Sequence, residues 1–138
     1  MATILAVVGI SDVEKIERIK QLCDAMNRGD LDSAVELGHP EIVLVRAGGQ
    51  GELQGLAALR AWMEPDAFSS QFLEPLGFEV AGDGVLANLR STVRGATSGI
   101  EMQIDAWTVY EFDHQGRFTR VEIFLEHEEE DARRALRD

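Results

Sequence analysis

The spacing of apolar and polar residues changes partway along the chain. Up to about residue 63 the apolar residues recur every three or four positions, a spacing typical of helices with one buried face. From about residue 78 onward, apolar and polar residues alternate, as they do in strands with one face turned toward a core. The pattern therefore predicts helices first and antiparallel sheet afterwards, which is an α+β organisation.

Three helices are expected in the first half. Ser11 and Glu14 form a capping-box pattern, so the first helix should cover residues 12–28. Asp30 can cap a second helix, and a third should begin at residue 55 and end before Pro65. The expected core face of the first helix contains Ile16, Ile19, Leu22, Cys23 and Met26, and its polar side contains Glu14, Lys15, Glu17, Arg18 and Lys20.

The longest expected strand covers residues 100–112, and its two faces differ in character. Its even positions, from Met102 to Phe112, should face inward, while Trp107 and Val109 lie on the outward face among polar neighbours. The acidic residues 128–131 and the arginines after them match the dipole of a short C-terminal helix. The other expected strands are residues 42–45, 78–81, 85–93 and 120–126.

The length of the chain fits one domain. It has 138 residues, 45% of them hydrophobic, and a chain of this size can bury one core without a disulfide or a metal. We assign residues 12–138 to a single domain and residues 1–11 to an N-terminal arm or strand. The apolar run at residues 4–8 has no Lys or Arg before it and is too short to span a membrane, so it is not expected to be a signal peptide or an anchor.

The charge of the chain disfavours some classes of binding partner. Its net charge is -12, which would repel a polyanion over most of the surface, so neither nucleic acid nor an anionic membrane is expected to bind. Cys23 is the only cysteine and cannot form an internal disulfide, which is compatible with a reducing cytoplasm. A cytoplasmic location is therefore expected.

Several short segments carry a family resemblance. Residues 23–63, CDAMNRGDLDSAVELGHPEIVLVRAGGQGELQGLAALRAWM, contain Asn-Arg-Gly-Asp-Leu-Asp at 27–32, His-Pro-Glu at 39–41 and Gly-Leu-Ala-Ala-Leu-Arg at 55–60. This stretch resembles the opening half of ketosteroid isomerase and the wider SnoaL-like, nuclear transport factor 2-like superfamily. The resemblance implies a cone-shaped, strongly curved mixed or antiparallel sheet, a cystatin-like α+β roll, with three N-terminal helices over its concave face, a short C-terminal helix and a pocket between sheet and helices.

The residues that carry the isomerase reaction are absent. By resemblance, the tyrosine of the oxyanion hole falls on Leu22, the general-base aspartate on Arg46, and the neutral carboxylic acid on Thr108. Leucine donates no hydrogen bond, arginine cannot act as a base at neutral pH, and threonine is a weaker donor than a carboxylic acid. We therefore expect no steroid isomerase activity, and no catalytic residue is assigned.

Arg46 is the most specific candidate for ligand binding, because a guanidinium at a pocket mouth can bind a carboxylate. An arginine beside a glycine-rich loop can equally be solvated or paired with an acid such as Glu52. Trp62 and Tyr110 can line a pocket or pack in the core. The full set of expected ligand-binding residues is Arg46, Thr108, Tyr110, Trp62, Leu22, Met26, Met102 and Val121.

Other chemistries have weaker support in the sequence. The three histidines lack the spacing of metal ligands, so no metal and no cofactor is expected. An epoxide hydrolase-like site would need an arginine and two aspartates facing inward, whereas Arg90 and Asp105 are expected to face outward. Cys23 lies in an apolar helical stripe, which disfavours a nucleophilic thiolate.

Two main classes of function follow. The first is a pocket that binds a hydrophobic small molecule carrying an acidic or carbonyl group. The second is an enzyme resembling polyketide cyclases, isomerases or dehydratases, for which Glu101, Asp105 or Glu126 would have to face inward. A protein-interaction module is a third alternative. We also expect a homodimer formed through the outer face of the sheet, including Trp107 and Val109.

Overall fold

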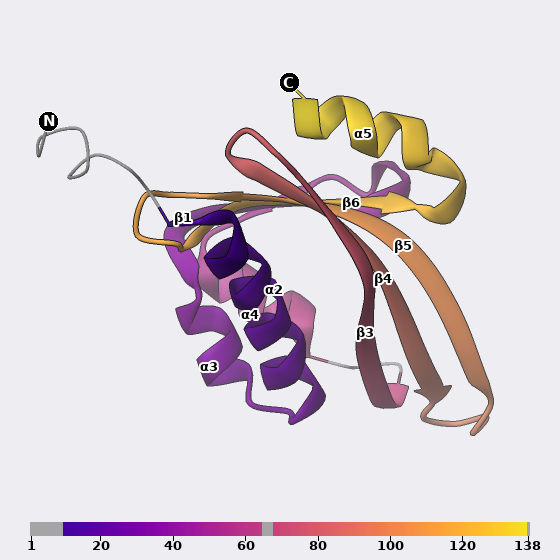
Figure 1. The fold of residues 1–138 in the computed structure, drawn as a ribbon. Helices are drawn as coiled ribbons and strands as arrows, with labels where there is room; N and C mark the ends of the chain where they lie inside the picture. Colours follow the sequence, from indigo (N-terminus) through magenta and orange to yellow (C-terminus); the bar gives the residue numbers. More distant parts are fainter. Residues whose placement is uncertain (1–9, 65–67, 138) are drawn as a thin grey trace, which may run out of the picture.

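A single curved sheet of six strands organises the chain (Figure 1). The computed structural model describes residues 10–64 and 68–137, and gives only the backbone for residues 68–70 and 137. The spatial order of the strands is β2-β1-β6-β5-β4-β3, in which β1 and β6 are parallel and every other pair is antiparallel. The strands are β1 (Gly38–Val45), β2 (Glu52–Gln54), β3 (Phe68–Ala81), β4 (Gly84–Gly95), β5 (Glu101–Phe112) and β6 (Phe118–Leu125).

Helices cover both faces of this sheet. The helices α2 (Asp12–Asn27), α3 (Leu31–Glu36) and α4 (Leu56–Met63) lie on the concave side, and α5 (Glu129–Arg137) lies across the opposite side (Figure 1). Ser11 caps α2 by accepting a hydrogen bond from the Glu14 amide, and Asp30 caps α3 in the same way through Ser33. The predicted α+β architecture, with three helices over the concave face and a short C-terminal helix, is confirmed.

The packing of helices on both faces of the sheet forms two hydrophobic clusters. The larger one fills the space between the concave face and its helices and includes Ile19, Leu44 and Phe118. The smaller one lies under α5, where Ala132 packs on Leu86 and Val109. The sheet is therefore buried on both faces near its centre.

The strand β3 is much longer than predicted. The prediction gave only residues 78–81, yet the strand begins at residue 68 and contains Pro75 and Gly77, which are unusual within a strand. As an edge strand, β3 tolerates a proline, and its pairing with β4 shifts register between Pro75 and Gly77. The prediction also missed β2 and the start of β1 at Gly38.

Lys15 corrects the expected faces of the first helix. It was assigned to the polar side, but it is buried, and its ammonium group donates to the Gly82 carbonyl at 3.4 Å and lies 3.8 Å from Asp12. Its aliphatic stem packs while its charge reaches the β3–β4 turn. Most of the predicted N-terminal arm, residues 1–9, lies outside the described residues.

Candidate functional site

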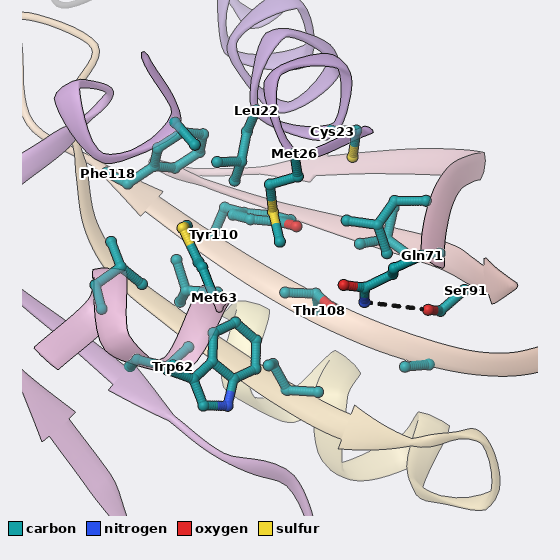
Figure 2. Close-up of a pocket in the computed structure, with 18 of the residues that line it drawn as sticks. Leu22, Cys23, Met26, Trp62, Met63, Gln71, Ser91, Thr108, Tyr110 and Phe118 are labelled. Atoms are coloured by element: carbon teal, nitrogen blue, oxygen red, sulfur yellow. Dashed lines mark hydrogen bonds between the residues drawn. The ribbon is translucent and has the colours of Figure 1, made fainter. Parts of the chain in front are cut away.

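A cavity of about 250 Å³ lies between the helices and the concave face of the sheet (Figure 2). Its helical wall comes from α2, α3 and α4, and its other walls come from the inward positions of β1, β3, β4, β5 and β6. Those inward positions alternate along each strand, so the predicted even face of β5 is the one that meets the cavity. The curvature of the sheet thus leaves room that the apolar side chains do not fill.

Tyr110 and Thr108 form the buried end of this cavity. Both are 3% exposed, and Tyr110 packs against Phe118 with their ring centroids 5.3 Å apart. Burial raises the pKa of Tyr110 well above its usual range, the neighbouring Cys23 adds to this rise, and a hydrogen bond from the Thr108 hydroxyl opposes it. The phenol therefore stays neutral at physiological pH and can donate a hydrogen bond but not act as a base.

The helical wall is apolar and adaptable. Leu22, Cys23 and Met26 face the cavity from α2, and Trp62 and Met63 face it from α4 (Figure 2). Burial raises the pKa of the Cys23 thiol to about 11, while a hydrogen bond to the backbone of Cys23 acts against this rise. The thiol is therefore protonated at neutral pH, and the two methionines can adjust to differently shaped ligands.

Gln71 and Ser91 interrupt the apolar lining. The side-chain amide of Gln71, on β3, donates a hydrogen bond of 3.3 Å to the Ser91 hydroxyl on β4 (Figure 2). Both residues line the cavity beside Leu73 and Val93. The pair could not be predicted from the sequence, because no strand is predicted at Gln71. The signal available was Ser91 itself, a polar residue in the apolar alternation of β4.

Six of the eight expected ligand-binding residues line the cavity. Met102 does not belong to the lining, since it lies beyond Ile104 toward the end of β5 and is 49% exposed. Arg46 is also absent from the lining. The six that line the cavity are Leu22, Met26, Trp62, Thr108, Tyr110 and Val121.

Arg46 is held by its own loop rather than directed at the cavity. Its guanidinium donates to the Gln50 carbonyl, and its backbone amide donates to Gly51 at 3.0 Å. No ion pair joins it to Glu52 among the described residues, and its buried Nε atom has no hydrogen-bond partner there. The expectation of an inward guanidinium is thus corrected: the glycine-rich turn after β1 folds back over the arginine.

The carboxylates considered for acid–base chemistry also lie away from the cavity. Asp105 faces the outer side of β5, where Arg90 binds it through two hydrogen bonds of 2.9 Å and 3.1 Å. The hydrogen bond from Arg90 lowers the pKa of Asp105. Glu101 pairs with Arg94, and Glu126 begins the turn before α5. Among the lining residues described, none carries a formal charge.

The three histidines lie in separate elements. His39 lies in β1 and accepts a hydrogen bond from the Glu41 amide, whereas His114 and His127 lie in separate turns. Across residues 10–64 and 68–137 there is no group of three His, Cys, Asp or Glu side chains placed to hold a metal ion. Within the same residues no helix is long and apolar enough to cross a membrane.

The apolar residues assigned to a dimer interface are partly covered by the chain itself. Val109 is 3% exposed and packs beneath α5 with Ala132. Trp107 donates from its indole nitrogen to the Glu126 carbonyl at 3.1 Å, and the Arg133 guanidinium lies 5.6 Å from the centre of its ring. The alternation of the strand was predicted correctly, but α5 supplies the partner of Val109. The homodimer itself stays a prediction.

Comparison with known proteins agrees with this architecture. The family model described as a SnoaL-like domain matches residues 19–121, so the chain belongs to the SnoaL-like domain family. This family is part of the nuclear transport factor 2-like superfamily. A sequence comparison with curated proteins gives no match.

Solved structures with the same fold have varied names. The epoxide hydrolase/cyclase-like enzyme SalBIII of salinomycin pyran ring formation is 18% identical, with a TM-score of 0.77 over 83% of this chain and 92% of that one. An LEH-like epoxide hydrolase of M. tuberculosis is 16% identical, with a TM-score of 0.71 over 90% of each chain. A cystatin fold protein of Novosphingobium aromaticivorans is 23% identical, with a TM-score of 0.69 over 83% and 98%. At these identities the likeness shows the fold alone.

Proposed function

We propose that this protein binds an uncharged hydrophobic small molecule in the cavity between α2, α4 and the concave face of the sheet. The observation that carries the proposal is the composition of the lining. Its described residues are mostly apolar, and their polar groups are one neutral amide, three hydroxyls, a thiol and an indole. A cavity with a few polar groups among apolar walls is the usual form of a small-molecule site.

The neutrality of the lining argues for a neutral ligand. An ionised carboxylate would lose its hydration on entering and would find no cation, because Arg46 is bound to its own loop. Burying a charge without a partner costs several kcal/mol (about 3–5 kcal/mol in proteins). A carbonyl or hydroxyl group costs less and can hydrogen-bond to the lining. The carbonyl form of the predicted ligand is therefore favoured over the acidic form.

Binding can be tested with three compounds on one scaffold: naphthalene, 2-acetylnaphthalene and 2-naphthoate. We expect the two neutral compounds to raise the melting temperature of the native protein more than the anion does. Ala106→Trp would fill the cavity and abolish this effect, while Gln103→Trp, on the outer face of the same strand, would keep it. Equal stabilisation of the two variants would contradict binding in the cavity.

An enzyme of the cyclase or isomerase kind is the weaker alternative. Its support is the presence of enzymes among proteins of this fold. Against it, Asp105 and Glu101 are paired with arginines outside the cavity, and Tyr110 remains protonated. An interaction module, the third alternative, would not need an internal cavity of this size.

A further inference from the structure

The Gln71–Ser91 pair lies near the more open end of the cavity. Ser91 is the register partner of Ile104, which is 46% exposed, whereas Thr108 and Tyr110 at the other end are almost fully buried. Ile104, the register partner of Ser91, and Thr108 are four residues apart along β5, a distance of about 13 Å in an extended strand. The cavity thus has a polar group at each end and apolar walls between them.

The two polar ends differ in their access from outside the cavity. At the buried end, Thr108 and Tyr110 interact with each other and are both 3% exposed. At the open end, the hydrogen bond from Gln71 to Ser91 uses one N–H of the amide. Among the described residues, no other hydrogen bond of the Gln71 side chain or of the Ser91 hydroxyl proton is present.

This leftover capacity does not depend on the orientation of the amide. As drawn, Gln71 retains an N–H donor and a carbonyl oxygen, and Ser91 retains its hydroxyl proton (Figure 2). If the amide were turned over, Ser91 would donate to Gln71, and both amide N–H donors and a serine lone pair would be left. Either arrangement leaves at least one donor and one acceptor facing the cavity.

We propose that Gln71 and Ser91 form the polar subsite that selects the ligand, binding a hydroxyl or carbonyl oxygen while the apolar body of the ligand extends toward Tyr110. The inference rests on the proposed function and specifies it: the ligand is an uncharged hydrophobic compound with an oxygen at one end. A pair of neutral groups suits such an oxygen, since a neutral hydrogen bond discriminates without the desolvation of a charge.

The test compares naphthalene, 2-naphthol and 2-acetylnaphthalene by isothermal titration calorimetry at pH 7. The native protein should bind the two oxygen-bearing probes about threefold to tenfold more tightly than naphthalene, as expected for one or two neutral hydrogen bonds. Ser91→Thr keeps a hydroxyl and should keep this preference. Ser91→Val has the shape of the threonine variant without the hydroxyl and should lose the preference. Gln71→Leu should lose it too, and both variants should bind naphthalene with little change.

Matched controls lie on the outer face of the sheet, on β4 and the neighbouring β5. Thr92 and Gln103 are register partners, and they face away from the cavity. Thr92→Val and Gln103→Leu make the same chemical changes there and should leave all three affinities unchanged.

The outcomes separate the subsite from the cavity. A preference lost in Ser91→Val but kept in Ser91→Thr supports the subsite. If all three probes bind the native protein and every variant with one unchanged ratio, the subsite is wrong while the proposed function stands. If none of the probes binds the native protein, the proposed function fails and the subsite fails with it.

Discussion

Asn27 pairs with the backbone of Leu73 as a neighbouring strand would. The Leu73 amide donates to the side-chain oxygen of Asn27 at 2.7 Å, and the Asn27 amide donates to the Leu73 carbonyl at 2.9 Å. Asn27 is the last residue of α2, so this pair fixes the end of the helix against β3. Because α2 and β3 both line the cavity, the pair sets the separation of two of its walls.

Removing the Asn27 side chain should destabilise the protein. Asn27→Ala would leave two backbone groups of Leu73 without their partner, and we expect the free energy of unfolding to fall by about 1–3 kcal/mol. Urea denaturation followed by circular dichroism measures this change. Gln103→Ala, an exposed substitution, should stay within about 0.5 kcal/mol. If Asn27→Ala lost no more stability than Gln103→Ala, the pair would not be a structural link.

Arg46→Ala should have little effect on ligand binding. Because the guanidinium contacts its own loop, the dissociation constants of 2-acetylnaphthalene and 2-naphthoate should change by less than about twofold. A hydrogen bond from a charged group to the ligand would instead contribute about 1.5–3 kcal/mol, or more than about tenfold. Calorimetry with both compounds distinguishes the small change from the tenfold loss. A selective loss of naphthoate binding would restore the anion-binding role of Arg46.

The Cys23 thiol should react slowly with thiol reagents. Its pKa of about 11 leaves only a small thiolate fraction at pH 8, and the side chain is buried. A free cysteine of pKa about 8.5 has a much larger thiolate fraction at pH 8, and this difference alone should make Cys23 react about a hundredfold more slowly or slower still. Labelling with a chromogenic disulfide reagent measures the rate, and unfolding in guanidinium should restore it. A native rate equal to the unfolded rate would contradict the buried position.

Asp113 should make stability depend on pH in the acidic range. Burial raises its pKa, but the hydrogen bonds from the Arg117 and Gln115 amides and the Arg117 guanidinium outweigh this and hold the pKa below its ordinary value. A lowered folded-state pKa stabilises the fold above the ordinary value of about 3.9, and this contribution is lost as the pH falls through the folded-state value.

Unfolding free energies at several pH values test this contribution. Asp113→Asn should reduce stability at pH 7 and flatten the decline below about pH 4, because the group that titrates is gone. If the unfolding free energy of Asp113→Asn fell at acidic pH as much as that of the native protein, the fall would come from other carboxylates.

A homodimer should use the part of the outer sheet face that α5 leaves uncovered. Phe72 is 53% exposed there and pairs in register with Thr92, whereas Val109 is buried under α5. We therefore expect a dimer mass in light scattering at tens of micromolar, and a monomer mass for Phe72→Arg. Trp107→Arg should also loosen α5, because Trp107 contacts it. A monomeric native protein would contradict the prediction.

The sequence predicted the fold where periodicity and local capping agree. The helix α2 was placed to within a residue, because Ser11, Glu14 and an apolar stripe all indicate the same element. The inward face of β5 was also predicted, since strict alternation leaves only one choice of buried side. These features are local, so a single sequence contains them.

The candidate site was harder to predict because it depends on contacts distant in the chain. Gln71 gains its place from the pairing of β3 with β4 at the sheet edge, where turn-like residues disguise the strand. The glycine-rich loop after Arg46 has no pattern that indicates its path, so the Gln50 carbonyl could not be predicted as the partner of the guanidinium. The covering of Val109 by α5 likewise requires the path of the chain after β6.

The irregular edge strand has a consequence for aggregation. Open sheet edges can recruit strands from other chains, which is the route to fibrils. Along β3 an incoming strand would meet Pro75, which lacks an amide proton, and two shifts of register. Continuous strand addition is therefore interrupted midway along the longest edge of the molecule. The irregularities of this strand therefore oppose edge-to-edge pairing with another chain.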